Sequence, residues 1–339
     1  MLSGKTTIAK IASFAGVGTA TVDRVLNDRP HVRDEMRQRV IQAKLAIESR
    51  GEQATFKKPH RIRVLLPEGA GPATEFLSAA LQEYGRFENA FVECVFTKKL
   101  DPAVLARKLR ACARQGINAV AFQALDEPRV HDAVDELAEF RIPCLALMSN
   151  FESDSLIGFV GLDNRSAGRT AGLLMGRSLH QNAKVAILSG GGLYRVHEER
   201  EMGFRALIRS ESPNIEIVGT LNGGDDIRGN HEAVIKLIKE QPDLAGIYNV
   251  GGGNEGVIRA FSDLVAKGDI VFIGHNLTRK TKAYLLEGSM DFVIHLNIRN
   301  AAEQAVRHLI AYLDDRPFKP VRLPAEIITR ENLNGVSIS

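Results

Sequence analysis

Beyond Arg61 the chain alternates between short β-rich apolar runs and longer segments with helical periodicity, and this alternation constrains the fold more than any other feature. Parallel strands joined by helical crossovers produce such a rhythm. About ten apolar runs are present, which is more than one open twisted sheet usually holds. We therefore predict an α/β fold with two parallel βαβ sheets side by side, forming two lobes.

The element boundaries follow from that pattern. We expect strands at residues 62–66, 91–96, 119–122, 144–148, 159–162, 185–188, 215–221, 246–250, 270–273 and 292–296. Helices are expected between most of them, for example at 102–115, 128–140, 167–179, 198–209 and 301–313. The first lobe should span about 61–162 and the second about 165–290, with the late strands crossing between lobes and a cleft near Asp163 and near residues 275–296.

The first 50 residues have a different organisation. Their apolar residues fall at helical spacing in three bursts, which end at Gly16, at residues 27–30 and at Gly51. Residues 51–60 are polar and basic and contain one proline, which is typical of a linker. We predict a small all-α domain at 1–50, a short linker at 51–60 and the two-lobed domain at 61–339.

Charge divides the chain in the same place. The 339 residues carry a net charge of +3, but residues 1–60 hold 11 basic and 6 acidic side chains. Such asymmetry indicates a basic domain that meets a polyanion, attached to a nearly neutral body. Apolar residues at 44% and charged residues at 25% are ordinary for a globular protein and exclude disorder or a fibrous repeat.

The segment from Thr7 to Val40 has the layout of a helix-turn-helix, with a second helix that begins near Gly18. Short side chains at its start let the backbone approach the bases, and one arginine can bind guanine O6 and N7. We expect Thr19, Ala20 and Arg24 to face the major groove, and Thr21, Asn27, His31 and Arg33 to contact the backbone. The alternative is an ordinary three-helix subdomain with a solvated charged face.

The stretch GVGTATVDRVLN resembles the signature of the LacI/GalR family of bacterial repressors, which usually has serine in place of Gly18 and Asp23. The resemblance implies that Thr19, Ala20 and Arg24 read base edges. It also implies that Thr21 and Asn27 contact phosphates and that His31 lies beside the operator backbone. The linker departs from the family, because the Pro-Asn, Ala-Arg and leucine of the usual hinge helix are absent.

The rest of the chain resembles the periplasmic-binding-protein-like effector domain of the same family, in its ribose-type branch. The similar stretches are VGLDNRSAGRTAGLLMGR, EEREMGF, IYNVGGGNEG and VFIGHNLT. The resemblance implies that Arg200, Asn249 and Asn276 bind a ligand, with Asp163 or Asn164 and Ser149 or Asn150 on the other lobe. The family usually has aspartate in place of Asn276. Alternatively these are satisfied turn residues, while Phe76 and Phe151 either stack on a sugar ring or belong to the core.

Other site types lack support in the sequence. Two glycine clusters, 190–192 and 251–253, follow predicted strands, but neither matches a dinucleotide or phosphate-loop motif. The three cysteines are not at metal-ligand spacing, and no catalytic motif is present, so we expect no cofactor, no metal and no enzyme activity. No signal sequence or membrane span is recognised, which predicts a cytoplasmic protein without a membrane partner.

The sequence therefore predicts a ligand-responsive transcriptional regulator, most simply a repressor of a carbohydrate or polyol utilisation operon. Its partners would be a double-stranded, palindromic DNA operator and a small effector such as a sugar, polyol or sugar derivative. A homodimer is expected, with a tetramer possible. The alternatives are a sugar-binding receptor without DNA-specific function and a nucleotide-dependent α/β enzyme.

Overall fold

The computed structural model describes residues 8–30, 32, 36–37, 39–41, 43–44, 47, 59–69, 72–88, 90–98, 101–179, 182–191, 195–264, 270–318 and 322–336. The chain divides into two compact units, Met1–Pro59 and His60–Ser339, and each is described by itself. Residues 51–58 of the predicted linker lie outside the described residues. Because the usual hinge-helix residues are absent from this linker, we predict that it forms no leucine-wedged hinge helix on DNA.

The first unit is a small helical domain. Helices α1 (Ile8–Ala15) and α2 (Thr19–Leu26) are joined by a tight turn in which Gly16 has φ +63°, a backbone conformation that glycine adopts at little cost. The described residues from 36 to 47 are helical as well. Apolar side chains from all these segments form one core, which contains Ile11, Ala12, Ala15, Val22, Val25, Val40 and Ala43.

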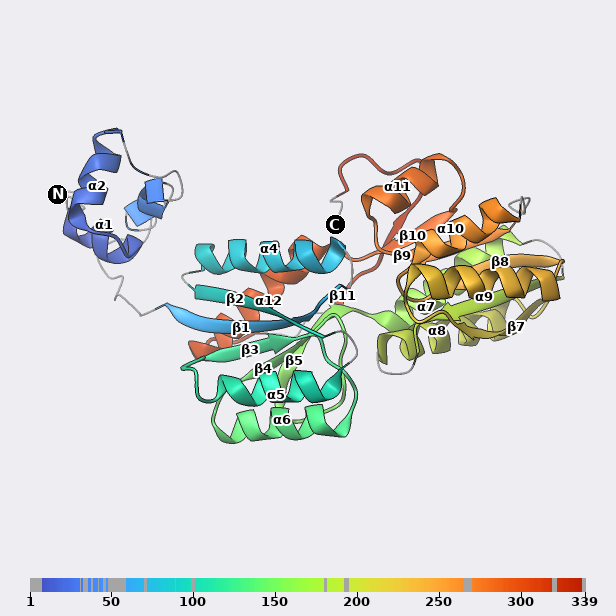
Figure 1. The fold of residues 1–339 in the computed structure, drawn as a ribbon, viewed down its shortest axis with the longest axis horizontal. Helices are drawn as coiled ribbons and strands as arrows, with labels where there is room; N and C mark the ends of the chain where they lie inside the picture. The colour runs from blue at the N-terminus through green and yellow to red at the C-terminus, as the bar shows by residue number, and fades with distance from the viewer. Residues whose placement is uncertain are drawn as a thin grey trace. The chain divides into compact units, whose positions relative to one another are not determined.

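The first lobe of the second unit is built on a parallel six-stranded sheet with the order β11-β5-β4-β3-β1-β2. Its strands are β1 (His60–Pro67), β2 (Ala90–Thr97), β3 (Ala119–Phe122), β4 (Cys144–Leu147), β5 (Leu156–Leu162) and β11 (Arg322–Leu323). Figure 1 shows helices on both faces of this sheet. One face carries α4 (Pro72–Phe87) and α12 (Ile298–Leu313), and the other α5 (Pro102–Cys112) and α6 (Pro128–Glu139).

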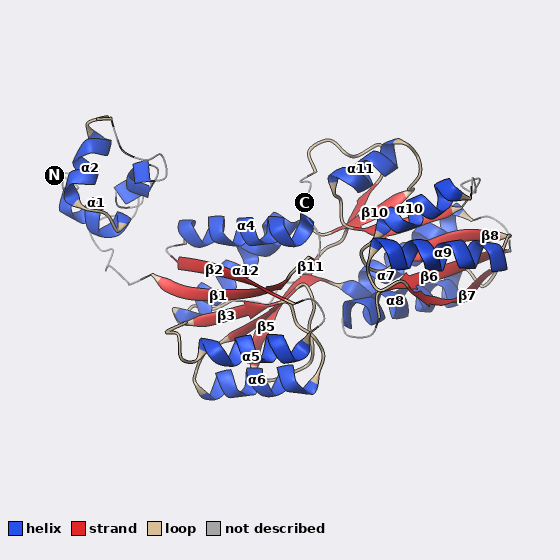
Figure 2. Cartoon of the chain, viewed as in Figure 1, coloured by secondary structure: helices blue, strands red, loops and turns tan. Residues whose placement is uncertain are grey.

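The second lobe repeats this architecture with the strand order β12-β10-β9-β8-β6-β7 (Figure 2). Its strands are β6 (Ala183–Ser189), β7 (Ile215–Asn222), β8 (Leu244–Asn249), β9 (Val271–His275), β10 (Phe292–His295) and β12 (Glu326–Ile328). Helices α7 (Asn164–Ser178) and α8 (Arg195–Glu211) cover one face. The other face carries α9 (Ile227–Glu240), α10 (Asn254–Asp263) and α11 (Arg279–Leu286). The predicted two-sheet α/β fold is confirmed.

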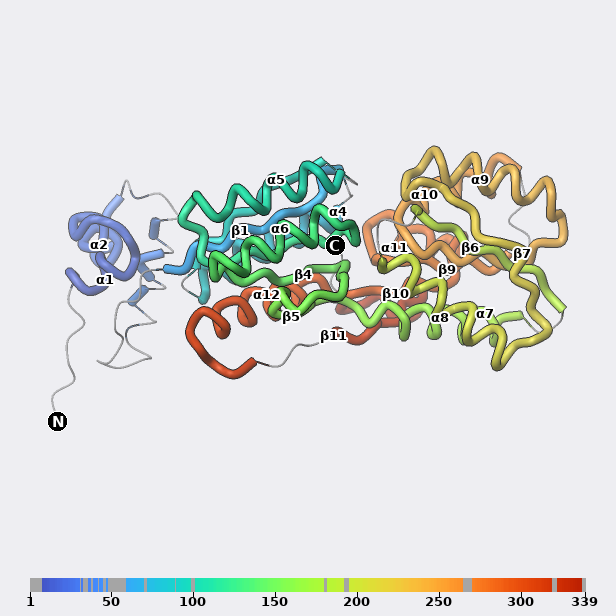
Figure 3. Tube along the Cα trace, turned by 90° about the horizontal axis from the view of Figure 1, so that it is seen from below, coloured from blue at the N-terminus to red at the C-terminus, as the bar shows by residue number. Residues whose placement is uncertain are grey.

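Within the described part of the chain, the backbone passes between the lobes after β5, after β10 and between β11 and β12. Figure 3 shows α12, late in the sequence, beside β5 of the first lobe, and the two elements are in contact. Strands β11 and β12 were not predicted, because segments of two and three residues are too short to show periodicity. Strand β12 also pairs antiparallel to β10, which departs from a purely parallel arrangement.

Polar N-caps start the helices that follow the first two crossings. The Asp163 carboxylate accepts a hydrogen bond from Ser166 N at 3.0 Å, and the Asn297 side chain accepts one from Asn300 N at 3.1 Å. Each bond satisfies a backbone donor that the first helical turn leaves without an intrahelical partner. The chain therefore changes from strand to helix where it changes lobes.

Glycines let α7 and α8 approach at backbone distance. A Cβ atom built on Gly168 would collide with the carbonyl oxygen of Arg200, and one built on Gly203 would collide with the carbonyl oxygen of Arg165. One helical turn from Gly168, a Cβ on Gly172 would lie 3.2 Å from the Phe204 carbonyl oxygen. This close contact fixes the position of the α8 backbone at Arg200.

We predict that Gly168→Ala destabilises the protein by about 1 to 3 kcal/mol, because the added methyl group forces two helix backbones apart. Alanine is intrinsically the better helix former, so a loss of stability would come from this packing. Urea unfolding provides the measurement. Gly219→Ala is the control, because a Cβ there meets no atom within 4 Å; equal effects of the two substitutions would contradict the prediction.

Candidate functional site

Helix α2 presents one polar face. Thr19, Ala20 and Arg24 are exposed and Thr21 is partly exposed, while Val22 and Val25 on the opposite side are buried in the helical core. This division follows from the 3.6-residue period of the helix. The residues predicted to read base edges therefore share one accessible surface.

The ends of α2 differ from the family pattern. Gly18 at the N-cap provides no side-chain hydrogen bond. Near the C-terminal end, the Asp23 carboxylate accepts a hydrogen bond from Asn27 Nδ2 at 2.8 Å and lies 3.3 Å from Arg29 Nη1. The carboxylate that replaces the usual serine is thus partly neutralised within the domain. His31 and Arg33 lie outside the described residues, so their DNA contacts stay predictions.

Arg200 lies at the centre of the second candidate site. Its Nε donates a hydrogen bond to Asn164 Oδ1 at 2.9 Å, and its Nη1 donates one to the Val250 carbonyl oxygen at 2.6 Å. Asn164 is the first residue of α7 and is 2% exposed, and Val250 directly follows β8. The arginine therefore connects the lobe crossing to the carboxyl edge of the second sheet, where open α/β sheets bind ligands.

Three ring side chains, Tyr248, His275 and Phe204, pack together near Arg200. Tyr248 Oη and His275 Nε2 are 2.9 Å apart, and Phe204 stacks on Tyr248 with ring centroids 4.9 Å apart. Burial raises the pKa of the Tyr248 hydroxyl, and burial together with the Arg200 charge lowers the pKa of His275 well below its usual value. Both groups are therefore neutral at pH 7.

Two residues that were predicted to contact the ligand, Asn249 and Asp163, use their side chains for hydrogen bonds within the protein. The Asn249 amide nitrogen donates to Gly252 O at 2.8 Å and to Asn254 Oδ1 at 2.7 Å, and Asn249 Oδ1 accepts from Gly251 N at 3.2 Å. The Asp163 carboxylate caps α7. These bonds favour the alternative interpretation of both residues as turn residues. They also occupy the Gly251 amide, which makes the 251–253 loop a poor phosphate cradle.

Two other predicted residues, Ser149 and Asn150, have buried polar atoms without a hydrogen-bond partner in the described part of the chain. These atoms are Ser149 Oγ and Asn150 Oδ1. Asn276 follows β9 with φ +69°, a conformation that asparagine tolerates, and its backbone N–H donates to Ile294 O. Unpartnered buried polar atoms are costly, so a ligand or water at Ser149 and Asn150 would be favourable.

The aromatic candidates are not open platforms. Phe151 is 1% exposed and stacks on His131 with ring centroids 4.0 Å apart, so it belongs to the core of the first lobe and is not placed to stack on a sugar. Phe76 lies on α4, where the Arg299 guanidinium carbon is 5.9 Å from its ring centroid. The sequence position beside a strand end did not distinguish these environments.

The start of α8 bridges the lobes, which the sequence did not reveal. Arg195 Nη2 lies 2.8 Å from Glu152 Oε1 of the first lobe, and Val196 packs into a cluster that otherwise consists of first-lobe residues. An ion pair between residues 43 positions apart leaves no periodic signal in the sequence. Helix α8 thus carries both Arg200 and a direct contact between the lobes.

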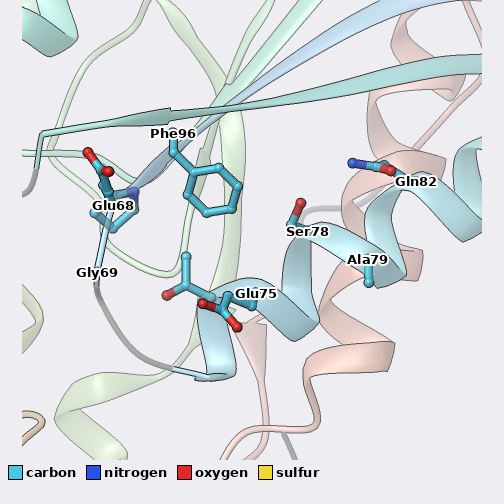
Figure 4. Close-up of a pocket in the computed structure, with 9 residues that line it drawn as sticks. Glu68, Gly69, Glu75, Ser78, Ala79, Gln82 and Phe96 are labelled. Atoms are coloured by element: carbon cyan, nitrogen blue, oxygen red, sulfur yellow. The ribbon is translucent and has the colours of Figure 1, made fainter.

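A pocket of about 550 Å³ lies in the first lobe, beside the edge strand β2. Figure 4 shows Glu68 and Glu75 at one end, Ser78 and Gln82 along α4, and Phe96 of β2 facing the helix. None of the residues predicted to bind the effector lines it.

Within the described ranges, no cluster of His, Cys, Asp and Glu suits a metal ion, and no helix is long and apolar enough to cross a membrane.

Each of the two units matches a known protein family model. Residues 7–46 match the family model "Bacterial regulatory proteins, lacI family", and residues 67–317 match the periplasmic binding protein domain. The HTH-type transcriptional regulator DegA of Bacillus subtilis (strain 168) is 26% identical over 208 residues, which is 59% of this chain and 60% of DegA. The chain thus aligns with less than two thirds of that relative.

Two solved structures have the fold of the second unit. A glucose-galactose binding protein, GanP, from Geobacillus stearothermophilus has a TM-score of 0.77 at 18% identity and covers 82% of this chain and 100% of its own. A transporter solute-binding protein from Burkholderia graminis C4D1M, in complex with D-arabinose, has a TM-score of 0.78 at 18% identity over 83% of this chain and 99% of its own. The chain belongs to the periplasmic binding protein domain family, whose model matches residues 67–317, and it carries in front of that domain a segment, residues 7–46, that matches bacterial regulatory proteins of the lacI family.

Proposed function

We propose that this protein is a ligand-responsive transcriptional regulator, acting in the cytoplasm as a repressor of a carbohydrate or polyol utilisation operon. The domain of α1 and α2 binds a palindromic operator, and a small polar effector binds between the lobes near Arg200. Effector binding changes the lobe arrangement and thereby the affinity for DNA. In the proposed mechanism, regulation by the effector involves no cofactor and no catalytic step.

One observation carries the proposal: the exposed face of α2 holds the residues that the family uses to read DNA, in a chain that also carries a cleft arginine. Thr19 and Ala20 are short and exposed at the start of the helix, and Arg24 follows on the same face. A sugar receptor for uptake, the alternative, has no use for such a helix. The solved sugar-binding proteins match the second unit without it, since GanP aligns over its full length with 82% of this chain.

Arg24→Ala should weaken binding to the selected operator by about 1 to 3 kcal/mol and relax the preference at one base pair in each half-site, because a bidentate contact to guanine is lost. Operator selection followed by fluorescence anisotropy at several salt concentrations measures both effects. Arg209→Ala is the control, since it removes an equal charge from an exposed position on α8. If both variants bind every sequence as the wild type does, Arg24 does not read bases.

We further propose that the protein is a homodimer, because a palindromic operator presents two equivalent half-sites. The outer edge of β2 is the surface we assign to the dimer. Phe91 and Phe96 on β2 are 58% and 42% exposed, and Phe87 at the end of α4 is 60% exposed. An edge strand with exposed aromatic side chains would be covered by a second copy of the chain.

Phe91→Glu should therefore shift the protein toward monomer. Each of the two copies would lose about 2 kcal/mol of apolar burial, so the dimer dissociation constant should rise at least about a hundredfold. Sedimentation velocity across a concentration series gives the dissociation constant. Phe140→Glu adds the same charge at a 65% exposed phenylalanine after α6; an equal response of both variants would move the interface away from β2.

A further inference from the structure

Arg200 differs from its neighbours on α8 in having only neutral hydrogen-bond partners. Arg195 pairs with Glu152 and Glu199, and Arg205 pairs with Glu201 at 2.7 Å. Arg200 donates to an amide oxygen and a backbone carbonyl. No described carboxylate oxygen lies within 4.0 Å of its guanidinium nitrogens, although burial lowers the pKa of Arg200.

The surroundings of Arg200 do not supply the missing negative charge. Tyr248 and His275 behind it are neutral at pH 7, as argued above. The charges of Asp225 and Glu199 act on the guanidinium through space and raise the pKa of Arg200. The Asp225 carboxylate is already engaged by the Gly252 N–H. A half-buried cation with these partners is undercompensated.

The residue that follows the neighbouring strand β9 is neutral as well. Strands β8 and β9 are parallel neighbours, and Val250 and Asn276 each come directly after their strand. Asn276 thus lies at the same sheet edge as the carbonyl that Arg200 binds. Asn276 therefore adds no negative charge to this edge, where the sequence resemblance leads one to expect an aspartate.

Part of the guanidinium remains accessible. The two protein acceptors occupy one N–H of Nε and one of Nη1, out of the five that arginine offers. Nη2 has no hydrogen-bond acceptor among the described residues, and it is not one of the polar atoms sealed from solvent. Nη1 and Nη2 together present the paired donors that bind a carboxylate in bidentate geometry.

We propose that the effector carries an anionic group, and that Arg200 binds it as the counter-ion that the ligand-free chain lacks. The class of ligand is an acidic sugar derivative, such as an aldonic or uronic acid, rather than a neutral sugar or polyol. Its hydroxyl groups donate to Ser149 Oγ and Asn150 Oδ1, the buried acceptors of the first lobe. This inference rests on the proposed function, because it concerns the same cleft.

The first test uses sulfate as the minimal anion, with thermal unfolding of the full chain at an ionic strength matched with sodium chloride. Binding to the folded state raises the midpoint. We expect sulfate to raise the midpoint of the wild type and of Arg205→Gln, the ion-paired control on the same helix, but not that of Arg200→Gln. Equal shifts in wild type and Arg200→Gln, or no shift in the wild type, would overturn the proposal.

Asn276→Asp adds a negative charge at the sheet edge that Arg200 contacts, without removing any Arg200 hydrogen bond seen here. It should weaken sulfate binding at least about tenfold, because the new carboxylate competes for the guanidinium and repels the anion. This variant also keeps the test decisive if Arg200→Gln fails to fold. Unchanged sulfate affinity in Asn276→Asp counts against the assignment.

The second test compares sugar acids with their neutral parents, namely D-gluconate with D-glucitol, D-glucuronate with D-glucose and D-galacturonate with D-galactose. We expect Arg200-dependent stabilisation from an acid and not from its parent. A neutral parent that stabilises as strongly as its acid through Arg200 overturns the acidic class but leaves the regulator proposal intact. Operator binding without any ligand tests the regulator proposal independently.

Discussion

The close contact between α7 and α8 is the interaction on which the candidate effector site depends. Gly168 and Gly203 remove the side chains that would separate the two helices. With the backbones this near, Arg200 reaches Asn164 at the start of α7 and the carbonyl of Val250 beyond β8. The same helix begins with Arg195 and Val196, which contact the first lobe. One helix therefore joins Arg200, the crossing and the opposite lobe.

This arrangement gives a physical route from effector to lobe movement. A ligand that binds Arg200 acts on a helix whose first turn is already held by the other lobe. Because that ion pair is partly exposed, its contribution is modest and the lobes remain able to move. A shift in the balance between two lobe arrangements requires only that the ligand prefers one of them.

Local sequence patterns predicted the fold better than they predicted the environments of individual residues. The two-sheet fold was predicted and is confirmed, because strand periodicity is a local pattern. For Asn249 and Phe151 the sequence left two interpretations open, a ligand contact or a structural role, and the structure favours a turn for the first and the core for the second. Asparagine after a strand and phenylalanine in a loop suit both environments equally well. Local sequence therefore does not distinguish them.

The sequence by itself determined the order of the elements, the helical N-terminal unit and its basic charge, because these depend on periodicity and composition over neighbouring residues. Only the tertiary structure decided that Arg200 has no acidic partner, that Arg195 contacts Glu152, and that strands β11 and β12 complete the two sheets. Those features join residues far apart in the chain. Their physical basis is close packing and charge balance in space, which leave no spacing pattern to read.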